Sequence, residues 1–418
     1  MGRTFLAVLI VSLLLGTPVS GSPRGASLVE LRGTVFVDAN GNGRMDDGEH
    51  GLAGVAVSDQ VNVVVTDHDG HYALRSDAAT STGIAFVSVP DGYRATDSFF
   101  YTVAASNTPA SGAPGATPID FALSHAPLAR SFTFVHASDT HISATSVGRT
   151  ARLRALVDSI KPAFVLITGD LVRDALRVSE AEATGYYDLF QSEAAKFTRE
   201  LWTVPGNHEN FGIERDKSGV SASNPLYARA LYRKYRGPDY YSFTRGGVHF
   251  VALNTVDIDD TRYYGHVDSL QLEWLARDLA LLSPTTPVVT FNHIPFFSSA
   301  ETINGYTEAP PAPSIITVAG KTAFRHTVSN ARDVLARITG TSASRPYPLA
   351  LAGHVHIRET IRLVGLETRF DQISAVIAPT PGPGTVFSSG ISVYRVTSQT
   401  ISEGTFVPLG LDARPPTR

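Results

Sequence analysis

Residues 132–141 read Phe132-Thr-Phe-Val-His-Ala-Ser-Asp139-Thr-His141, an apolar run that stops at two side chains able to bind a metal ion. The same arrangement, an apolar run of strand type followed by Asp, Asn or His, recurs four more times along the chain. The later blocks are Gly169-Asp170, Gly206-Asn207-His208-Glu209, Asn292-His293 and Gly353-His354-Val355-His356. Each block alone is a common combination of residues, so the ordered set carries the evidence.

From about residue 131 onward, strand-type runs alternate with helical patterns, which is typical of a layered α/β domain. Functional groups in such domains collect at the carboxyl ends of strands, so we expect the five blocks to converge on one cleft. The chain has no cysteine, and any metal there would be bound by Asp, Asn, Glu, His or backbone oxygen. The other histidines, His326 among them, are expected on the surface or in the core.

The ordered set Asp-x-His, Gly-Asp, Gly-Asn-His-Glu, His and Gly-His-x-His resembles the calcineurin-like metallophosphoesterase superfamily over about residues 131–360. The segments Gly247-Val-His-Phe-Val-Ala-Leu-Asn254 and Gln271-Leu-Glu-Trp274-Leu are similar to the family's middle strands and the helix after them. The resemblance implies an α/β fold, a four-layer α/β/β/α sandwich. We therefore predict a catalytic domain over residues 131–363, completed by C-terminal edge strands over residues 364–410.

The resemblance also implies a centre of two divalent transition metals, with Mn, Zn and Fe as candidates. One metal would be bound by Asp139, His141 and His356, the second by Asn207, His293 and His354, and Asp170 would bridge the two. A carboxylate suits the bridge because each oxygen can serve one cation while its charge offsets the repulsion between them.

Such a centre is expected to hydrolyse phosphate esters (monoester, diester or nucleotide) by attack of a metal-bridging hydroxide. His208 is the candidate general acid for the leaving oxygen, with Glu209 to orient it. A simple hydrogen bond at a strand end is the alternative reading of His208. The alternative function is a cell-surface binding protein with an inactive phosphoesterase-like domain, although the presence of all seven ligand positions weighs against it.

One position departs from the family's usual pattern. The second block of the family commonly reads Gly-Asp-x-x-Asp, whereas this chain has Arg173 at the second acidic position and Asp174 one residue later. Asp170 itself is intact, so we expect a change in the support around the metal ligands rather than in the ligands.

A different composition marks residues 28–125, where short β-rich runs broken by Gly, Asp, Asn and Pro predict a smaller all-β sandwich domain. Residues 38–49 fit a twelve-residue calcium loop, with an Asn/Gly-rich turn that binds no ion as the alternative. The candidate calcium ligands are Asp38, Asn40, Asn42, Arg44, Asp46 and Glu49. With the residues that follow, the module resembles SdrD B-like and Cna B-type surface domains, which implies a spacer or positioning domain.

Residues 1–21 are typical of a signal peptide, with Arg3 before an apolar run and small residues after Pro18. The apolar run is shorter than the roughly 20 residues of a membrane span. We therefore expect a secreted or extracytoplasmic protein, in the periplasm or at the cell surface, with an uncleaved anchor as the alternative. No transmembrane segment is expected after the signal.

The net charge indicates which kind of binding partner to expect. The chain has 35 Lys and Arg against 39 Asp and Glu, which gives a net charge of −4. A polyanion such as nucleic acid is therefore not predicted, and a small-molecule phosphate ester is. The aromatic pairs Tyr186-Tyr187, Tyr263-Tyr264 and Phe296-Phe297 are candidates either to wall the cleft or to pack in the core. The sequence leaves the substrate and the oligomeric state open.

Overall fold

The computed structural model describes residues 28–77, 79–103, 118–127, 129–300, 313–340, 345–377 and 389–411. The predicted signal peptide at residues 1–21 lies outside these ranges. Within them, no helix is both long enough and apolar enough to cross a membrane.

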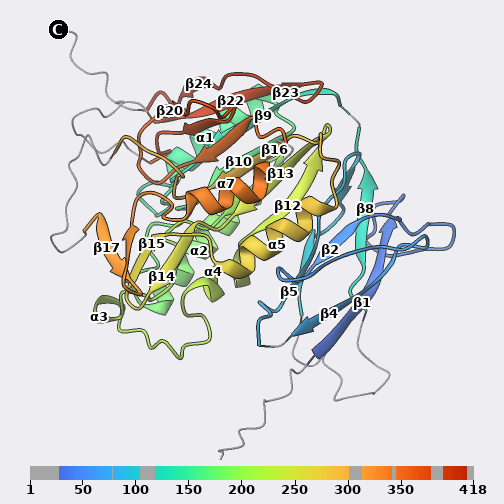
Figure 1. The fold of residues 1–418 in the computed structure, drawn as a ribbon, viewed down its shortest axis with the longest axis horizontal. Helices are drawn as coiled ribbons and strands as arrows, with labels where there is room; N and C mark the ends of the chain where they lie inside the picture. Colours follow the sequence, from blue (N-terminus) through green and yellow to red (C-terminus); the bar gives the residue numbers. More distant parts are fainter. Residues whose placement is uncertain are drawn as a thin grey trace, which may run out of the picture.

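Two four-stranded sheets form the N-terminal domain, drawn in blue to cyan (Figure 1). One has the order β4-β1-β8-β6, with β1 (Leu28–Val37), β4 (His71–Asp77), β6 (Tyr93–Ala95) and β8 (Phe121–His125). The other has the order β3-β2-β5-β7, with β2 (Ala56–Ser58), β3 (Val63–Val65), β5 (Ile84–Val87) and β7 (Phe100–Thr102). Buried and exposed residues alternate along β4, as expected for a strand with one face in the core.

The first large sheet has the order β11-β10-β9-β22-β23 and also includes β24, which pairs with β22. Its strands are β9 (Ser131–Ala137), β10 (Phe164–Thr168), β11 (Glu200–Val204), β22 (Gly390–Thr397), β23 (Thr400–Ile401) and β24 (Thr405–Pro408). β9, β10 and β11 are parallel, and every residue of β10 is buried, as expected for a strand covered on both faces. Helices α1 (Val147–Ile160) and α2 (Glu180–Ala194) share a hydrophobic cluster with its outer face.

The second large sheet has the order β12-β13-β16-β19-β21-β20. Its strands are β12 (Tyr241–Arg245), β13 (Val248–Leu253), β16 (Val288–Asn292), β19 (Leu349–Ala352), β20 (Glu359–Arg362) and β21 (Arg369–Gln372). Helices α5 (Ser269–Ala280) and α7 (Ala331–Thr339) lie in front of it in Figure 1 and bury Trp274 and Val334 in its core.

Aromatic side chains fill the space between the two large sheets. Phe134 and Phe164 of the first sheet stack with ring centroids 5.3 Å apart, and Phe250 of the second sheet meets both rings edge-on. The layers are therefore helix, sheet, sheet and helix, which confirms the predicted α/β/β/α sandwich.

The C-terminal segment contributes both interior and edge strands to the large sheets. β22 lies between β9 and β23, and β21 lies between β19 and β20, so neither is an edge strand. β22 pairs with β9 over six residues, which places the last part of the chain beside the first strand of the sandwich. β23 and β24 pair with the other side of β22 and form the edge of the first sheet, as predicted. The interior places of β21 and β22 could not be predicted, because hydrophobic pattern predicts a strand but not its neighbours.

Shorter elements surround the ends of the large sheets. They are α3 (Arg215–Ser218), α4 (Arg229–Arg236), the hairpin β14 (Val256–Asp259) with β15 (Arg262–Gly265), and the hairpin β17 (Ile315–Val318) with β18 (Lys321–Phe324). β14, β15, β17 and α3 gather at the lower left of Figure 1. β15 and β18 are in contact, so the two hairpins form one wall.

The N-terminal domain packs directly on the second large sheet. Gln60 donates to Asp239 Oδ1 (3.2 Å) and to the backbone oxygen of Tyr240 (2.9 Å), and Tyr240 Oη donates back to the Gln60 carbonyl (2.6 Å). Val89 forms a parallel bridge with Phe243 of β12, which is the edge strand of its sheet. The domain thus covers an edge that would otherwise expose unpaired backbone groups.

Candidate metal centre

Every sequence block lies directly after a strand. Asp139 follows β9, Asp170 follows β10 and Asn207 follows β11 in the first sheet, while His293 follows β16 and His354 follows β19 in the second. The centre is therefore built at the carboxyl ends of both large sheets.

The backbone of these blocks is unusual. Five of the predicted site residues have a positive φ between 38° and 72°, a conformation that costs a residue with a side chain about 1–3 kcal/mol. They are Asp139, His141, Asp170, His354 and His356. Tertiary hydrogen bonds hold the first blocks in place, since Asp139 N donates to the Gly169 carbonyl (3.0 Å) and His141 N to the Asp170 carbonyl (2.9 Å).

Two glycines allow the blocks to approach one another. A Cβ atom on Gly206 would lie 2.2 Å from Asp170 Oδ1, and one on Gly353 would lie 1.8 Å from Ser138 Oγ and 2.5 Å from Asp139 Oδ2. Both distances are far below van der Waals contact, so the close approach of the backbone requires glycine at these positions.

The first group of donor atoms comes from Asp139, His141 and His356. Asp139 Oδ1 lies 3.2 Å from His356 Nε2 and 3.8 Å from His141 Nε2, and the two nitrogens are 3.4 Å apart. Asp139 is fully buried, and its Oδ1 accepts no hydrogen bond from any residue that the structure describes. A buried carboxylate oxygen without a donor, facing two ring nitrogens, fits a bound cation.

The second group comes from Asn207, His293 and His354. His293 Nε2 lies 3.1 Å from both Asn207 Oδ1 and His354 Nδ1. The other ring nitrogen of His293, Nδ1, lies 2.7 Å from the Thr168 carbonyl, which can only accept. Nδ1 therefore carries a proton, and Nε2 is the nitrogen that faces the other donors.

Asp170 lies between the two groups. Its Oδ2 is 3.5 Å from His141 Nε2 in the first group, and its Oδ1 is 3.3 Å from His293 Nε2 in the second. Burial opposes ionisation, but the charges of His293 and His208 outweigh it and hold the pKa of Asp170 well below its usual range. Carboxylate, amide and imidazole donors with converging lone pairs fit two divalent cations bridged by this residue.

His208 lies at the open side of the centre. Its Nδ1 donates to the Arg173 carbonyl over 2.6 Å, so Nε2 is left facing the centre, 3.9 Å from Asp170 Oδ2. The side chain is 22% exposed, whereas that of Asp170 is 3% exposed. The strand-end hydrogen bond and a role toward substrate are therefore compatible, because they use different ring nitrogens.

Glu209 does not orient His208, contrary to the sequence-based prediction. Its carboxylate accepts from the backbone N–H groups of Asp170 (2.9 Å), Val172 (3.0 Å) and Gly206 (2.6 Å), so it ties the second and third blocks together. Burial and the charge of Asp170 raise the pKa of Glu209 to about 8, against the effect of these donors. Asp174, the acidic residue displaced by one position in the second block, accepts from the N–H groups of Leu176 and Arg177 and shapes the turn after that block.

Sequence reasoning missed His326, which was assigned to the surface or core. Its Nδ1 lies 2.8 Å from His354 Nε2. Nothing in its spacing from the five blocks could have shown this contact, because His326 follows the hairpin β17–β18 and reaches the centre only through the fold.

The aromatic pairs divide between the two expected roles. Tyr187 is buried in the core, where its hydroxyl donates to the Glu209 carbonyl over 3.0 Å. Tyr263 meets His354 edge-on, with ring centroids 6.0 Å apart. Phe296 and Phe297 line a separate open hollow of about 320 Å³ beside the β17–β18 hairpin.

The side chains of the candidate calcium loop form hydrogen bonds within the loop. Asp38 accepts from the N–H groups of Gly41, Asn42 and Gly43, and Asp46 Oδ2 accepts from the side-chain amides of Asn40 and Asn42. Among the described residues, the clusters of three His, Asp or Glu donors all lie at the centre above, and none includes Asp38, Asp46 or Glu49. Calcium binding by this loop stays a prediction.

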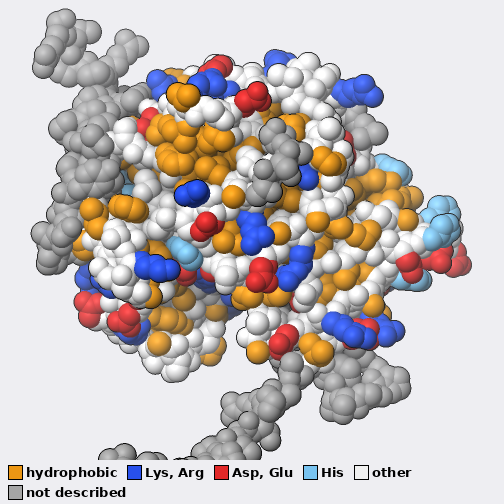
Figure 2. All heavy atoms as spheres, in the orientation of Figure 1, with side chains coloured by type: hydrophobic (Ala, Val, Ile, Leu, Met, Phe, Trp, Pro, Cys, Tyr) orange, Lys and Arg blue, Asp and Glu red, His pale blue; other side chains and the backbone are white. Residues whose placement is uncertain are grey.

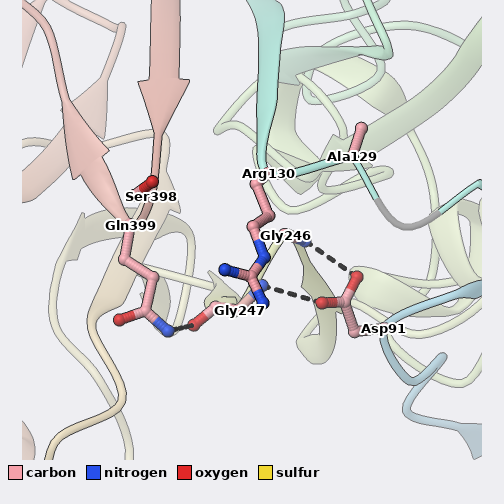
Figure 3. A pocket seen from close by; sticks show the side chains of 7 residues that line it. All are labelled: Asp91, Ala129, Arg130, Gly246, Gly247, Ser398 and Gln399. Atoms are coloured by element: carbon pink, nitrogen blue, oxygen red, sulfur yellow. Dashed lines mark hydrogen bonds between the residues drawn. The ribbon is translucent and has the colours of Figure 1, made fainter.

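An open cavity of about 470 Å³ lies at the amino-terminal side of the sandwich, where the turns β12–β13 and β22–β23 meet the N-terminal domain (Figure 3). Its lining residues are Asp91, Ala129, Arg130, Gly246, Gly247, Ser398 and Gln399. Asp91 accepts from the N–H groups of Gly246 and Gly247, both over 2.8 Å. No predicted site residue lines this cavity.

Comparison with known proteins identified two family models. Residues 132–358 match Calcineurin-like phosphoesterase, and residues 39–113 match the N terminal of Calcineurin-like phosphoesterase. The β-rich module is therefore a companion domain of this family, while its likeness to SdrD B-like and Cna B-type domains stays a prediction.

The relatives found are distant. A cAMP/cGMP dual specificity phosphodiesterase of Mycobacterium tuberculosis is 24% identical over 257 residues, which are 56% of this chain and 65% of that protein. A probable cyclic nucleotide phosphodiesterase of Rhodococcus erythropolis is 24% identical over 247 residues, 56% of this chain and 67% of that protein. Among solved structures, a dimetal phosphatase from Danio rerio is 15% identical and covers 68% of this chain and 98% of its own, with a TM-score of 0.44.

The family model for the catalytic domain covers more than half of the chain and contains all five blocks. The family uses a dinuclear metal centre, and the described residues hold His and Asp groups placed to bind metal. The assignment of each residue to a metal stays a prediction. The chain spans about two thirds of the length of the curated relatives it matches, and it belongs to the calcineurin-like phosphoesterase family.

Proposed function

We propose that this chain is an exported, dinuclear hydrolase of small phosphate esters, with phosphodiesters such as cyclic nucleotides as the favoured substrates. The observation that carries the proposal is the position of Asp170, whose two oxygens face two separate groups of donor atoms. The named activity of the Mycobacterium tuberculosis relative supports the diester class.

Asp139, His141 and His356 would hold one cation, and Asn207, His293 and His354 the second, with Asp170 shared between them. Mn, Zn and Fe are the candidate metals, since imidazole, carboxylate and amide donors accept each of them. When bound, two such cations supply Lewis acidity toward phosphoryl oxygens and lower the pKa of water.

His208 would carry the proton for the leaving oxygen on Nε2. The Arg173 carbonyl keeps Nδ1 protonated, so Nε2 is the nitrogen that gains and loses a proton. It faces the centre and is open to solvent on one side, which allows a leaving alkoxide to approach it. The buried Asp139 and Asp170 exclude water from the far side of the centre.

A small substrate agrees with the surface of the molecule. In Figure 2, Lys and Arg side chains are interspersed with Asp and Glu across the face shown. The net charge of −4 likewise offers no field to attract a polyanion. The second candidate, a cell-surface binding protein with an inactive catalytic domain, requires a centre that binds no metal or turns over no ester.

The test uses the purified chain loaded in turn with Mn²⁺, Zn²⁺ or Fe²⁺. We expect two metals per chain and turnover of bis-p-nitrophenyl phosphate and cAMP in excess of p-nitrophenyl phosphate. Asp170→Asn is expected to lose turnover and to bind metal more weakly. A chain that holds two metals and hydrolyses none of the three esters would instead support the binding protein.

Export and calcium binding need their own measurements. Mass spectrometry of the protein from its natural host should find a mature chain beginning near Ser22, and a retained Met1 would contradict signal cleavage. Calcium chelation should lower the thermal stability of the N-terminal domain if residues 38–49 bind the ion, and unchanged stability would rule that out.

A further inference from the structure

Both ring nitrogens of His354 are engaged. Nδ1 lies 3.1 Å from His293 Nε2, on the side of the second donor group, and Nε2 lies 2.8 Å from His326 Nδ1. The rings of His326 and His354 are inclined by only 25°, with centroids 5.0 Å apart. This is the geometry of an in-line hydrogen bond between two imidazoles.

The direction of that hydrogen bond follows from the role of the other nitrogen. A neutral imidazole carries one N–H, so a His354 that offers its Nδ1 lone pair to a cation must carry the proton on Nε2. Nε2–H then donates to His326 Nδ1, which acts as the acceptor. In metal sites the partner of the second nitrogen fixes both the tautomer and the orientation of the ligand ring.

His326 is itself held in place by its neighbours. Arg325 N donates to the Ser314 carbonyl (2.9 Å) before His326, and Val328 N donates to the Pro295 carbonyl (2.9 Å) after it. The guanidinium of Arg325 lies 4.3 Å over the ring of Tyr263. Tyr263 of β15 in turn meets His354 edge-on, so β15 and the segment after β18 both contact the His354 ring.

We propose that His326 is a positioning residue that fixes the Nε2–H tautomer of His354 and thereby sets the affinity of the second metal. The inference rests on the proposed function, because it needs His354 to be a ligand. It concerns a residue that lies outside the five blocks and contacts the ring of His354.

The variants are chosen to separate the acceptor from the bulk of the side chain. His326→Leu removes the acceptor, and we expect the second metal to bind about 10–100-fold more weakly while the first is unchanged. His326→Asn can place an amide oxygen near the position of Nδ1, and should restore most of the lost affinity. His266→Leu is the matched control, because His266 bonds Asp257 (3.0 Å) outside the donor groups.

Affinities are measured by calorimetric titration of the metal-free full chain with Mn²⁺. Electron paramagnetic resonance of the loaded protein reports the coupled pair of Mn²⁺ ions independently of turnover. In His326→Leu the coupled signal should be lost at a metal concentration that saturates the wild type, and it should return in His326→Asn.

If His326→Leu bound each of the two metals as tightly as the wild type does, this inference would be overturned. The proposed function would stand in that case, provided that the wild type binds two metals and is active. A loss at both sites together with a lower melting temperature of the metal-free chain would also overturn it, by showing a structural role only. A wild type that binds no second metal would overturn the proposed function as well.

Discussion

At the scale of single residues, we propose that His208 transfers a proton, and its ring also belongs to a group with His141 and Asp170 that could hold a metal ion. Its Nδ1 is committed to the Arg173 carbonyl, and its Nε2 faces the centre. We expect His208→Ala to lower kcat by about 10²–10⁴-fold with two metals retained. The loss should be larger for alkyl esters than for p-nitrophenyl esters, because a poor leaving group needs the proton more.

The kcat and the metal content are measured on the same preparation of His208→Ala. The control is His68→Ala, which replaces an exposed histidine and should change neither quantity. Unchanged turnover of an alkyl ester by His208→Ala would eliminate His208 as the acid. Loss of metal from that variant would assign it a ligand role instead.

His293 leads to a prediction about pH. In the metal-free chain, burial opposes protonation of His293, but the charge of Asp170 outweighs it and raises the pKa of His293 to about 9. Below that pH a cation must displace a proton, so the affinity of the second site should rise with pH up to about 9. Titrations at pH 7 in two buffers of different ionisation enthalpy should show proton release, and its absence would contradict this protonation state.

At the scale of elements, the loops after β10 and β11 approach too closely for a side chain at Gly206. A Cβ there would meet Asp170 Oδ1 and the backbone nitrogen of Asp170 at 2.2 and 2.4 Å. Gly206→Ala is therefore expected to lower the free energy of unfolding by about 1–3 kcal/mol and to weaken metal binding.

Gly185→Ala is a control that should change the free energy of unfolding in the opposite direction. Gly185 lies inside helix α2, and a Cβ there meets nothing within 4 Å. Gly185→Ala should therefore stabilise the chain by about 0.5–1 kcal/mol, because alanine favours the helix. Urea unfolding of both variants gives the comparison, and equal effects of the two changes would contradict the close approach at Gly206.

At the scale of the whole molecule, Asp239 links the two domains. This fully buried carboxylate accepts from Arg233 (2.8 Å), from Asn254 (2.9 Å) and from Gln60 of the N-terminal domain (3.2 Å). Burial opposes its ionisation, but Arg233 and Arg229 outweigh that effect and lower the pKa of Asp239. Its stabilisation is therefore present above the unfolded pKa of about 3.9 and is lost as pH falls through the lower folded value.

Asp239→Asn should lower the free energy of unfolding by about 1–3 kcal/mol, because the partly buried Arg233 loses the charge of its hydrogen-bond acceptor. One hydrophobic cluster contains residues of both domains, so wild type should unfold in a single transition. Urea unfolding followed by circular dichroism measures both effects, with exposed Asp158→Asn as control. Two well-separated transitions in wild type would show that the domains do not stabilise each other.

The α/β class and the blocks of site residues at strand ends could be predicted from local pattern, while the four-layer sandwich and the ligand assignments followed from the resemblance to a family. Apolar runs that end at Asp139, Asp170 or His293 identify strands and their carboxyl ends without any knowledge of tertiary contacts. The neighbours of those strands could not be predicted. β22 pairs with β9 across more than 250 residues of chain, and no periodicity records such a choice.

The amino-acid sequence by itself determined the positions of the main strands along the chain, the donor atoms at their ends and hence the kind of chemistry, since each depends on residue identity and hydrophobic period. Only the tertiary structure decided which nitrogen of each histidine faces the centre, through acceptors such as the Thr168 and Arg173 carbonyls and through His326. The physical reason is that a hydrogen-bond partner distant in the chain exists only after both sheets have packed together.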